Sequence, residues 1–324
     1  MFKLRAAATG VALTLGIAAV FVVPRWESDL RLQELGVFFI AILGLNIVTG
    51  YTGQISLGHS AFMAVGGYTT AILVVDHGVR DLWTIPVAAL AGGIAGFLVG
   101  LPALRLSGLY LALVTFGLAV AMPDLLKWDK LEFLTNGSKG FALFGNAQLT
   151  GKGFEHVHVL GHTLSFSRAM YYLTWAVALV LLVAAWALLR GAPGRAFRAV
   201  RDSEVAAASS GVNLAAYKTF AFALSAAYAA TAGSLYVLAN FFLDPQTFPA
   251  RFSLLILVGA VVARLGSLWG IVAGAAFIEF LPDLSVHISD KQGVPDTIYG
   301  ASVVAIILLL RFITPLTRRL YTRP

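Results

Sequence analysis

Residues 170–189 read MYYLTWAVALVLLVAAWALL, an unbroken apolar run without a charged side chain. A straight helix needs about 20 such residues to cross the hydrocarbon core of a bilayer. A strand of a membrane barrel would instead alternate apolar and polar residues. This stretch therefore predicts a membrane-spanning α-helix.

Comparable apolar runs follow one another along the chain. They lie at residues 6–23, 35–50, 55–75, 84–102, 108–126, 218–243, 252–263, 267–282 and 296–313. Because every backbone polar group must be satisfied internally in lipid, solid runs of this kind predict helices. We expect an all-α polytopic membrane protein, one domain over residues 1–324, with about ten membrane segments of which some are short or broken.

The composition excludes an ordinary soluble domain. Hydrophobic residues make up 59% of the 324 and charged residues 12%, about half the usual charged share. The chain has no cysteine, which excludes disulfides, a thiolate nucleophile and a cysteine metal site. The net charge of +7 comes largely from basic residues between apolar segments, which favours positive cytoplasmic loops over a nucleic-acid surface.

Three basic clusters predict the orientation of the chain. They lie at Lys3 and Arg5, in the loop 190–204, and in the C-terminal stretch 311–323. Under the positive-inside rule all three are cytoplasmic, which places both termini inside. A secretory signal peptide is the alternative for residues 6–23, but the run is long and lacks a small-residue cleavage site, so we interpret it as the first membrane helix.

The number of membrane crossings, which must be even or odd, constrains how residues 252–282 are arranged. Two cytoplasmic termini require an even number of crossings, and the run contains Arg264, Gly266, Ser267 and Gly270 near its middle. We predict two short helices that meet at this break, which would also accommodate the charge of Arg264 within the membrane. A single bent span is the alternative. Glu279 is a second ionisable residue in this part of the chain, with either a functional or a structural role.

The longest polar insertion, residues 127–168, is extracytoplasmic by the same parity. It contains the turn-rich stretch TNGSKG at 135–140. Residues 154–159 and 163–167 alternate between apolar and polar side chains, which predicts a small β-hairpin. Its three histidines, His156, His158 and His162, are candidate metal ligands, although exposed strand and turn histidines without a metal are more common.

Glycines and polar residues interrupt the apolar pattern at residues 46–60, which read NIVTGYTGQISLGHS. Broken backbone is tolerated at membrane depth only where it is buried in protein or lines a water-filled cavity. The functional interpretation is a translocation path with a discontinuous helix, and a tight turn between two helices is the alternative. The candidate path residues are Asn46, Gly53, Gln54, Ser56, Gly58 and His59.

A cytoplasmic helix is predicted within residues 190–216. Pro193 and Gly194 open this alanine-rich segment, and Gly211 ends it. Arg198, Arg201 and Glu204 recur at a spacing of three, which places them on one side of a single helix. Such a helix could dock into a groove of a cytoplasmic partner or lie solvated beside anionic lipid.

The stretch Glu204-Val205-Ala206-Ala207, followed by Gly211, resembles the Glu-Ala-Ala…Gly motif of ABC-importer permeases. In that family the helix couples the membrane subunit to an ATPase. The resemblance implies a coupling role for the segment, and the candidate residues are Arg198, Arg201, Asp202, Glu204, Ala206, Ala207 and Gly211.

Three further stretches resemble the M-type (LivM-type) permeases of the branched-chain amino acid importers. They are GYTGQISLGHSAF at 50–62, LTNGSKG at 134–140 and LGSLWG at 265–270. They occur in the family's order, and the Gln-x-Ser-x-Gly-His stretch points to the M-type subunit over its H-type relative. One departure is Arg264, where the family usually has a small residue.

The resemblance implies the rest of an importer. The expected partners are a paralogous second permease in a heterodimer, two ATPase subunits that use ATP and Mg, an extracytoplasmic binding protein, and the lipid of a bacterial inner (plasma) membrane. The candidate contacts for the binding protein are Asn136, Ser138 and Lys139. We expect no cofactor, metal or nucleic acid on this chain.

We expect a transport subunit and not an enzyme. The stretch most similar to a P-loop, residues 145–153, has a spacing one residue too long and Gly153 in place of Ser or Thr. Branched-chain amino acids are the expected substrates, with urea, amides or other amino acids as alternatives within the family. An ion-coupled secondary transporter would need more buried charges in mid-helix, and a membrane enzyme would need a cluster of acids, bases or metal ligands.

Overall fold

The computed structural model describes residues 29–79, 81–103, 106, 108–143, 157–159, 162–164 and 166–288, with the isolated residues 297, 300, 301, 304 and 305. The predicted first helix at 6–23, both basic termini, residues 145–153 and most of the run at 296–313 fall outside this part of the chain. The predicted cytoplasmic location of the termini therefore stays a prediction.

The described part of the chain is built mainly of helices, as the apolar runs predict. The longer ones are α2 (Asp29–Leu45), α3 (His59–Val75), α4 (Asp81–Ala103), α5 (Leu109–Leu126), α8 (Phe166–Arg190), α11 (Leu214–Asn240), α12 (Ala250–Val262) and α13 (Ile271–Ile288). Within the described part of the chain, five helices are long and apolar enough to cross a membrane, and three other apolar helices are shorter. The all-α membrane class is confirmed.

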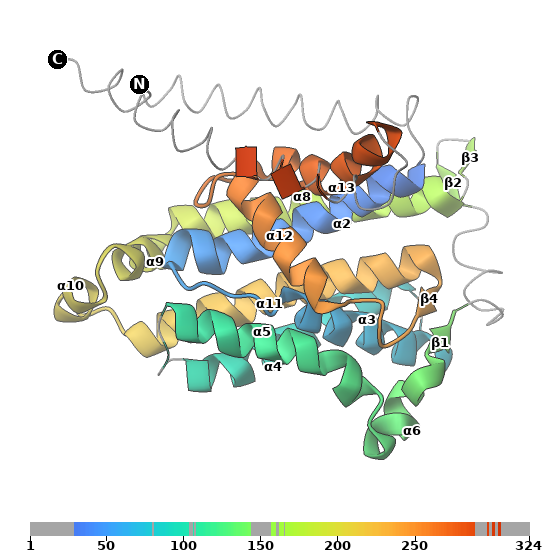
Figure 1. Ribbon diagram of the computed structural model, residues 1–324, viewed down its shortest axis with the longest axis horizontal. Helices are drawn as coiled ribbons and strands as arrows, with labels where there is room; N and C mark the ends of the chain where they lie inside the picture. Colours follow the sequence, from blue (N-terminus) through green and yellow to red (C-terminus); the bar gives the residue numbers. More distant parts are fainter. Residues whose placement is uncertain are drawn as a thin grey trace.

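Short elements gather at the two ends of the bundle (Figure 1). At one end lie α9 (Ala192–Asp202) and α10 (Glu204–Ser209). At the other end lie α6 (Glu132–Thr135), β1 (Phe141–Ala142), β2 (Val157–Val159), β3 (His162–Leu164) and β4 (Phe242–Leu243). The described parts of the polar insertion and the predicted coupling segment therefore lie at opposite ends of the bundle.

Two antiparallel strand pairs stand at the end that carries α6. Strands β2 and β3 pair with Val157 opposite Leu164 and Val159 opposite His162, where the alternating pattern predicts a hairpin. Strands β1 and β4 pair with Phe141 opposite Leu243. This second pair joins segments about one hundred residues apart, and the sequence pattern did not predict it.

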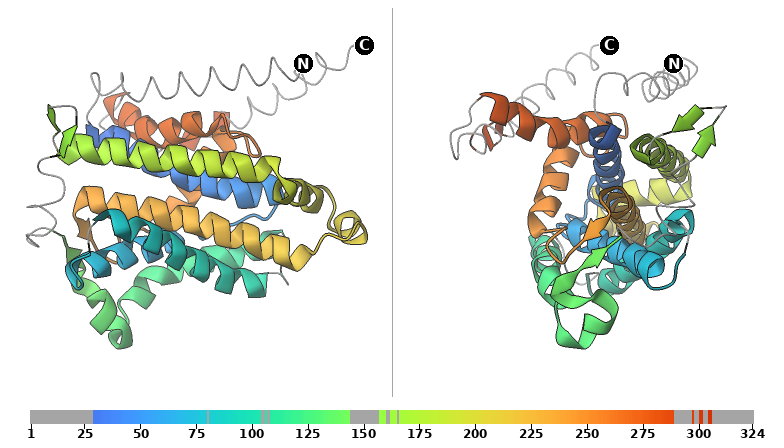
Figure 2. Two further views of the ribbon diagram at one scale, coloured as in Figure 1. Left: turned by 180° about the vertical axis from the view of Figure 1, so that it is seen from behind. Right: turned by 90° about the vertical axis from the view of Figure 1, so that its right-hand side faces the viewer.

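Helix α11 is the central element of the described bundle. It packs against α3 and α4 on one side and against α2 on the other, as both views of Figure 2 show. A methyl group added at Gly92 or Gly96 of α4 would overlap the Cβ atoms of Ala230 or Ala226 of α11. The glycine spacing on α4 therefore brings two helices of this chain into close contact.

The predicted break in residues 252–282 is present. Helix α12 ends at Val262 and α13 begins at Ile271, and the two helices contact each other across the turn between them. Arg264 in this turn has a left-handed backbone (φ 65°) and an exposed side chain. The prediction of two short helices is confirmed, and the Arg264 side chain between them is exposed and not buried by the other described residues.

Candidate translocation and coupling site

Helix α2 continues into a π-helical turn, η2 (Asn46–Tyr51), and then stops. Two hydroxyl groups close the break: Thr52 Oγ1 donates to Val48 O at 2.6 Å, and Thr49 Oγ1 donates to Gln54 O at 3.0 Å. Gly53 follows with a positive φ of 75°, a conformation that favours glycine. Residues 53–58 then form an irregular connection to α3, which is longer than the tight turn considered as the alternative.

Most of the predicted path residues are buried at this break. Gln54 Nε2 donates to Thr52 Oγ1 at 3.0 Å, and His59 Nε2 lies 3.1 Å from Ser225 Oγ of α11. In contrast, Ser56 Oγ and His59 Nδ1 are buried and have no hydrogen-bond partner among the described residues. Gly58 is buried and Gly53 is exposed. The structure thus brings these residues together in one largely buried break.

Asn46 has a different role from the other predicted path residues. Its side chain is 1% exposed. It forms two hydrogen bonds with the turn between α12 and α13. Nδ2 donates to Ser267 O at 2.8 Å, and Oδ1 accepts a hydrogen bond from Gly266 N at 2.7 Å. Asn46 therefore joins two segments more than two hundred residues apart. Both segments stand out in the sequence, but no local pattern predicts their contact.

The predicted coupling segment is two helices and not one. Helix α9 ends at Asp202, Ser203 has an extended backbone (φ −163°, ψ 114°), and α10 begins at Glu204. The Ser203 hydroxyl accepts a hydrogen bond from Ala206 N at 3.3 Å, which is a helix N-cap. The prediction that Arg198, Arg201 and Glu204 share one helix face is therefore wrong, because a serine that caps a new helix lies between them.

These three charged side chains bond to this chain itself. Arg198 Nη1 donates to Leu189 O at 3.1 Å, and Arg201 Nη1 donates to Gly50 O in η2 at 2.6 Å. Glu204 Oε2 lies 2.6 Å from Lys218 Nζ of α11, whose side chain is 9% exposed. Lys218 is not among the predicted site residues, although a lysine at the start of an apolar helix is a visible signal in the sequence.

Helix α10 has an outer and an inner side. Val205 is 82% exposed, and Ala206 is also exposed. Ala207 is 2% exposed and faces the bundle. Gly211, with a φ of 83°, ends the segment as predicted. Asp202, at the end of α9, is exposed.

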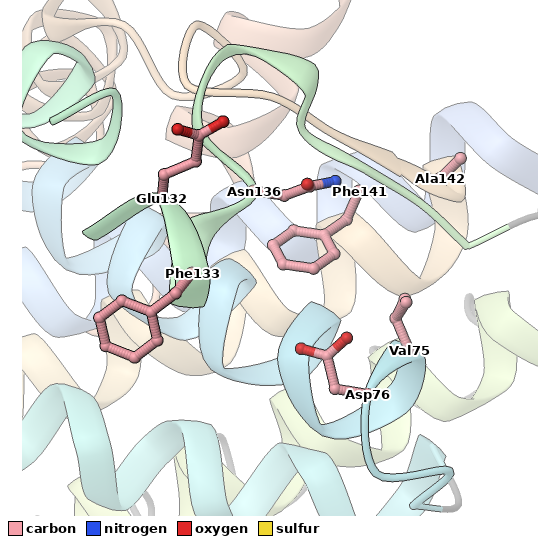
Figure 3. A pocket seen from close by; sticks show the side chains of 7 residues that line it. All are labelled: Val75, Asp76, Glu132, Phe133, Asn136, Phe141 and Ala142. Atoms are coloured by element: carbon pink, nitrogen blue, oxygen red, sulfur yellow. The ribbon is translucent and has the colours of Figure 1, made fainter. Parts of the chain in front are cut away.

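At the opposite end, the TNGSKG stretch forms a compact turn. Asn136 has a left-handed backbone and its Nδ2 donates to Gly140 O at 2.5 Å. Ser138 and Lys139 are exposed. Next to this turn is a cavity of about 270 Å³. Figure 3 shows the residues that line it, which include the carboxylates Asp76 and Glu132.

The described residues contain no group of three histidine or carboxylate side chains that could hold a metal ion. His156 lies outside the described residues, and His158 and His162 stand on β2 and β3. A metal site on the hairpin therefore has no support from the geometry of the described part.

Comparison with known proteins shows the family to which this chain belongs. The family model for the branched-chain amino acid transport system permease component matches residues 32–311. The high-affinity branched-chain amino acid transport system permease protein LivM of Escherichia coli (strain K12) is 32% identical over 324 residues, which cover 94% of this chain and 74% of LivM. LivM of Salmonella typhimurium is similar to the same extent. LivH of Escherichia coli is 24% identical over 290 residues, or 84% of this chain and 89% of LivH. No solved structure matches.

Proposed function

The chain belongs to the family of branched-chain amino acid transport permeases, and from this we propose that it is the M-type permease subunit of an ABC importer that translocates branched-chain amino acids delivered by a binding protein. Its described part has the apolar helices that a membrane subunit requires. Branched-chain amino acids are the proposed substrates because LivM and LivH, to which the chain is similar, are permeases of a branched-chain amino acid transport system. The location that follows is a bacterial inner membrane.

The observation that carries this proposal is the pair α9–α10 at one end of the bundle. Helix α10 exposes Val205 by 82% at a position where nothing in this chain covers it among the described residues. An exposed apolar side chain on a short projecting helix fits a groove of a partner protein. We propose that this surface, with Asp202 and Ala206, contacts a cytoplasmic ATPase.

The partners follow from the same family. The chain is similar to LivM and to LivH, two permease proteins of one transport system in Escherichia coli. We propose a heterodimer of this chain with a paralogous permease and two ATPase subunits, which bind and hydrolyse ATP with Mg. The binding protein would dock at the opposite end, at the turn that exposes Ser138 and Lys139.

Transport would proceed by alternating access. Binding of ATP changes the state of the ATPases, α9 and α10 move with them, and the break at 46–59 changes the side to which it is accessible. Each partner must bind one of the two states better than the other, since a ligand shifts an equilibrium only through its differential affinity. The buried, unpartnered atoms Ser56 Oγ and His59 Nδ1 are polar groups that a passing substrate could bond.

Uptake of radiolabelled leucine by cells with and without this chain tests the function. Loss of uptake on deletion, with competition by unlabelled valine and isoleucine, is the expected result. If deletion abolished uptake of urea or an amide and left leucine uptake unchanged, the importer would stand with a different substrate. If no uptake depended on the chain and it copurified with no ATPase, the proposal would be wrong.

A further inference from the structure

Three segments that are distant in the sequence meet at Gly50. Its carbonyl oxygen accepts the hydrogen bond from Arg201 Nη1 of α9. A methyl group added to Gly50 would lie 2.5 Å from Gly266 N and would overlap Asn46 Oδ1. A methyl group added to Gly266 would in turn lie 3.0 Å from Arg201 Nη1. The coupling helix α9, the break η2 and the α12–α13 turn are therefore in direct mutual contact.

Arg201 lies across this junction. Its side-chain stem packs on Gly53, where an added methyl group would lie 3.3 Å from Arg201 Cγ. Arg201 is exposed, yet its guanidinium turns back to the bundle and donates a charge-assisted hydrogen bond of 2.6 Å to the Gly50 carbonyl. A side chain that served only to contact another subunit would point away from the bundle instead.

Asn46 continues the connection to the α12–α13 turn. Its amide uses a donor and an acceptor on neighbouring main-chain groups, Ser267 O and Gly266 N. Gly266 has a φ of 82° and Arg264 a φ of 65°, so the turn contains two residues in the left-handed region. Two hydrogen bonds from one buried side chain hold this turn in a fixed position relative to η2.

The second helix of the coupling segment, α10, is connected to α11. Glu204 of α10 pairs with Lys218, and Lys218 O accepts a hydrogen bond from Gln54 Nε2 at 3.5 Å. This route leads to α11, the central helix, and not to the α12–α13 turn. Both helices of the coupling segment contact α11, where Phe197 of α9 packs on Tyr217 and Phe220, and α9 in addition reaches the α12–α13 turn through Arg201.

We propose that Arg201 and Asn46 are positioning residues. They hold α9, the break at 46–53 and the α12–α13 turn together as one unit, called here the strap. The proposal rests on the proposed function for its transport consequence. Movement of α9 then reaches the α12–α13 turn through η2, while Val205 on α10 provides the outward contact. Arg201 acts within this chain and is not itself a contact for the ATPase.

The structural part of the proposal is tested by amide hydrogen exchange in the full chain, assembled with its partner subunits in lipid nanodiscs. Arg201→Ala should raise exchange both in residues 46–53 and in residues 263–270, although Arg201 donates its hydrogen bond only to the first of these segments. Arg195→Ala, an exposed arginine of the same helix, is the matched control and should change neither segment. A rise confined to residues 46–53, or the same rise in both variants, would overturn the strap.

The functional part is tested by the ratio of leucine transported to ATP hydrolysed. Arg201→Ala should lower this ratio about tenfold, the factor that corresponds to one hydrogen bond to a charged group. Asn46→Asp, which keeps the acceptor for Gly266 N and loses the donor to Ser267 O, should lower it less than Asn46→Leu, which loses both. The double variant Arg201→Ala/Asn46→Leu should be no worse than Asn46→Leu alone, because two residues of one unit are not additive.

The outcomes separate this proposal from the proposed function. Equal losses of transport and hydrolysis in Arg201→Ala, with the ratio unchanged, would make Arg201 an ATPase contact and overturn the strap. Additive effects of the two substitutions would also overturn it. If the unsubstituted chain supported no leucine uptake, the proposed substrate would be wrong, while hydrogen exchange would still decide whether the strap exists.

Discussion

The two halves of the break at residues 46–59 differ in how their polar groups are satisfied. In the first half, Asn46, Thr49 and Thr52 all make hydrogen bonds to main-chain carbonyls. In the second half, Ser56 Oγ and His59 Nδ1 are buried without a partner among the described residues. Buried polar groups are normally bonded, because an unpaired one loses its hydration without a replacement.

The difference teaches that one broken helix can contain two kinds of site. A fully bonded segment is rigid and suits the transmission of movement from α9. A segment with unpaired polar atoms has capacity left for a ligand, and a substrate that moves through it could supply the missing hydrogen bonds. Substitutions in the first half should therefore reduce stability or, at Asn46, the coupling through the strap, and substitutions in the second half should change transport without a loss of stability.

The largest expected effect is that of Gly50→Val in the first half. The new side chain would overlap Asn46 Oδ1 and approach Gly266 N, which belongs to the backbone of another segment. Since backbone cannot move aside cheaply, we expect a loss of at least about 4 kcal/mol, which few membrane domains tolerate. The measurement is the yield and thermal stability of the purified protein in detergent.

Gly117→Val is the matched control for that substitution. Gly117 lies in α5, and a methyl group added there meets nothing within 4 Å. This variant should give nearly normal yield. Equal stability of the two variants would show that the contact between η2 and the α12–α13 turn does not form.

An intermediate effect is expected for Thr49→Val. The substitution keeps the shape of the side chain and removes the hydroxyl that donates to Gln54 O at 3.0 Å. The carbonyl then stays buried without this donor, which costs about 1–3 kcal/mol. Thermal unfolding should shift downwards, and the leucine-to-ATP ratio of the remaining folded protein should stay normal. A normal unfolding temperature would contradict the assignment of the first half to stability.

The sequence predicted the helices well, because membrane helices follow from continuous apolar runs. It placed the start of α2 too late, at residue 35 and not Asp29, since Arg31 and Glu34 interrupt the apolar pattern near the helix start. It also joined α9 and α10 into one helix, because the spacing of Arg198, Arg201 and Glu204 is helical and Ser203 gave no strong signal of a break.

The parts of the candidate site can be predicted from the sequence only where a local pattern of residues marks them. The break at 46–60 was visible in its glycines and polar residues, and the α12–α13 turn in Arg264 and Gly266. The contact between the two is not encoded in any local spacing, because Asn46 and Gly266 are brought together only by the packing of α2 and α13. For the same reason no local pattern predicts the hydrogen bond from Arg201 to Gly50.

Ser56→Ala is expected to have the smallest effect on stability. It is also the sharpest test of the difference between the two halves of the break. The substitution removes a buried hydroxyl whose oxygen has no hydrogen-bond partner among the described residues. No bond is lost in the resting protein, so the unfolding temperature should stay the same or rise by an amount that corresponds to at most about 1 kcal/mol. Leucine transport should nevertheless fall, because a substrate in the path loses one group that could bond it.

Thr49→Val would then change stability and not transport, and Ser56→Ala would change transport and not stability. If Ser56→Ala instead lowered stability and left transport unchanged, the second half of the break would be structural, and the path of the substrate would have to lie elsewhere in the bundle.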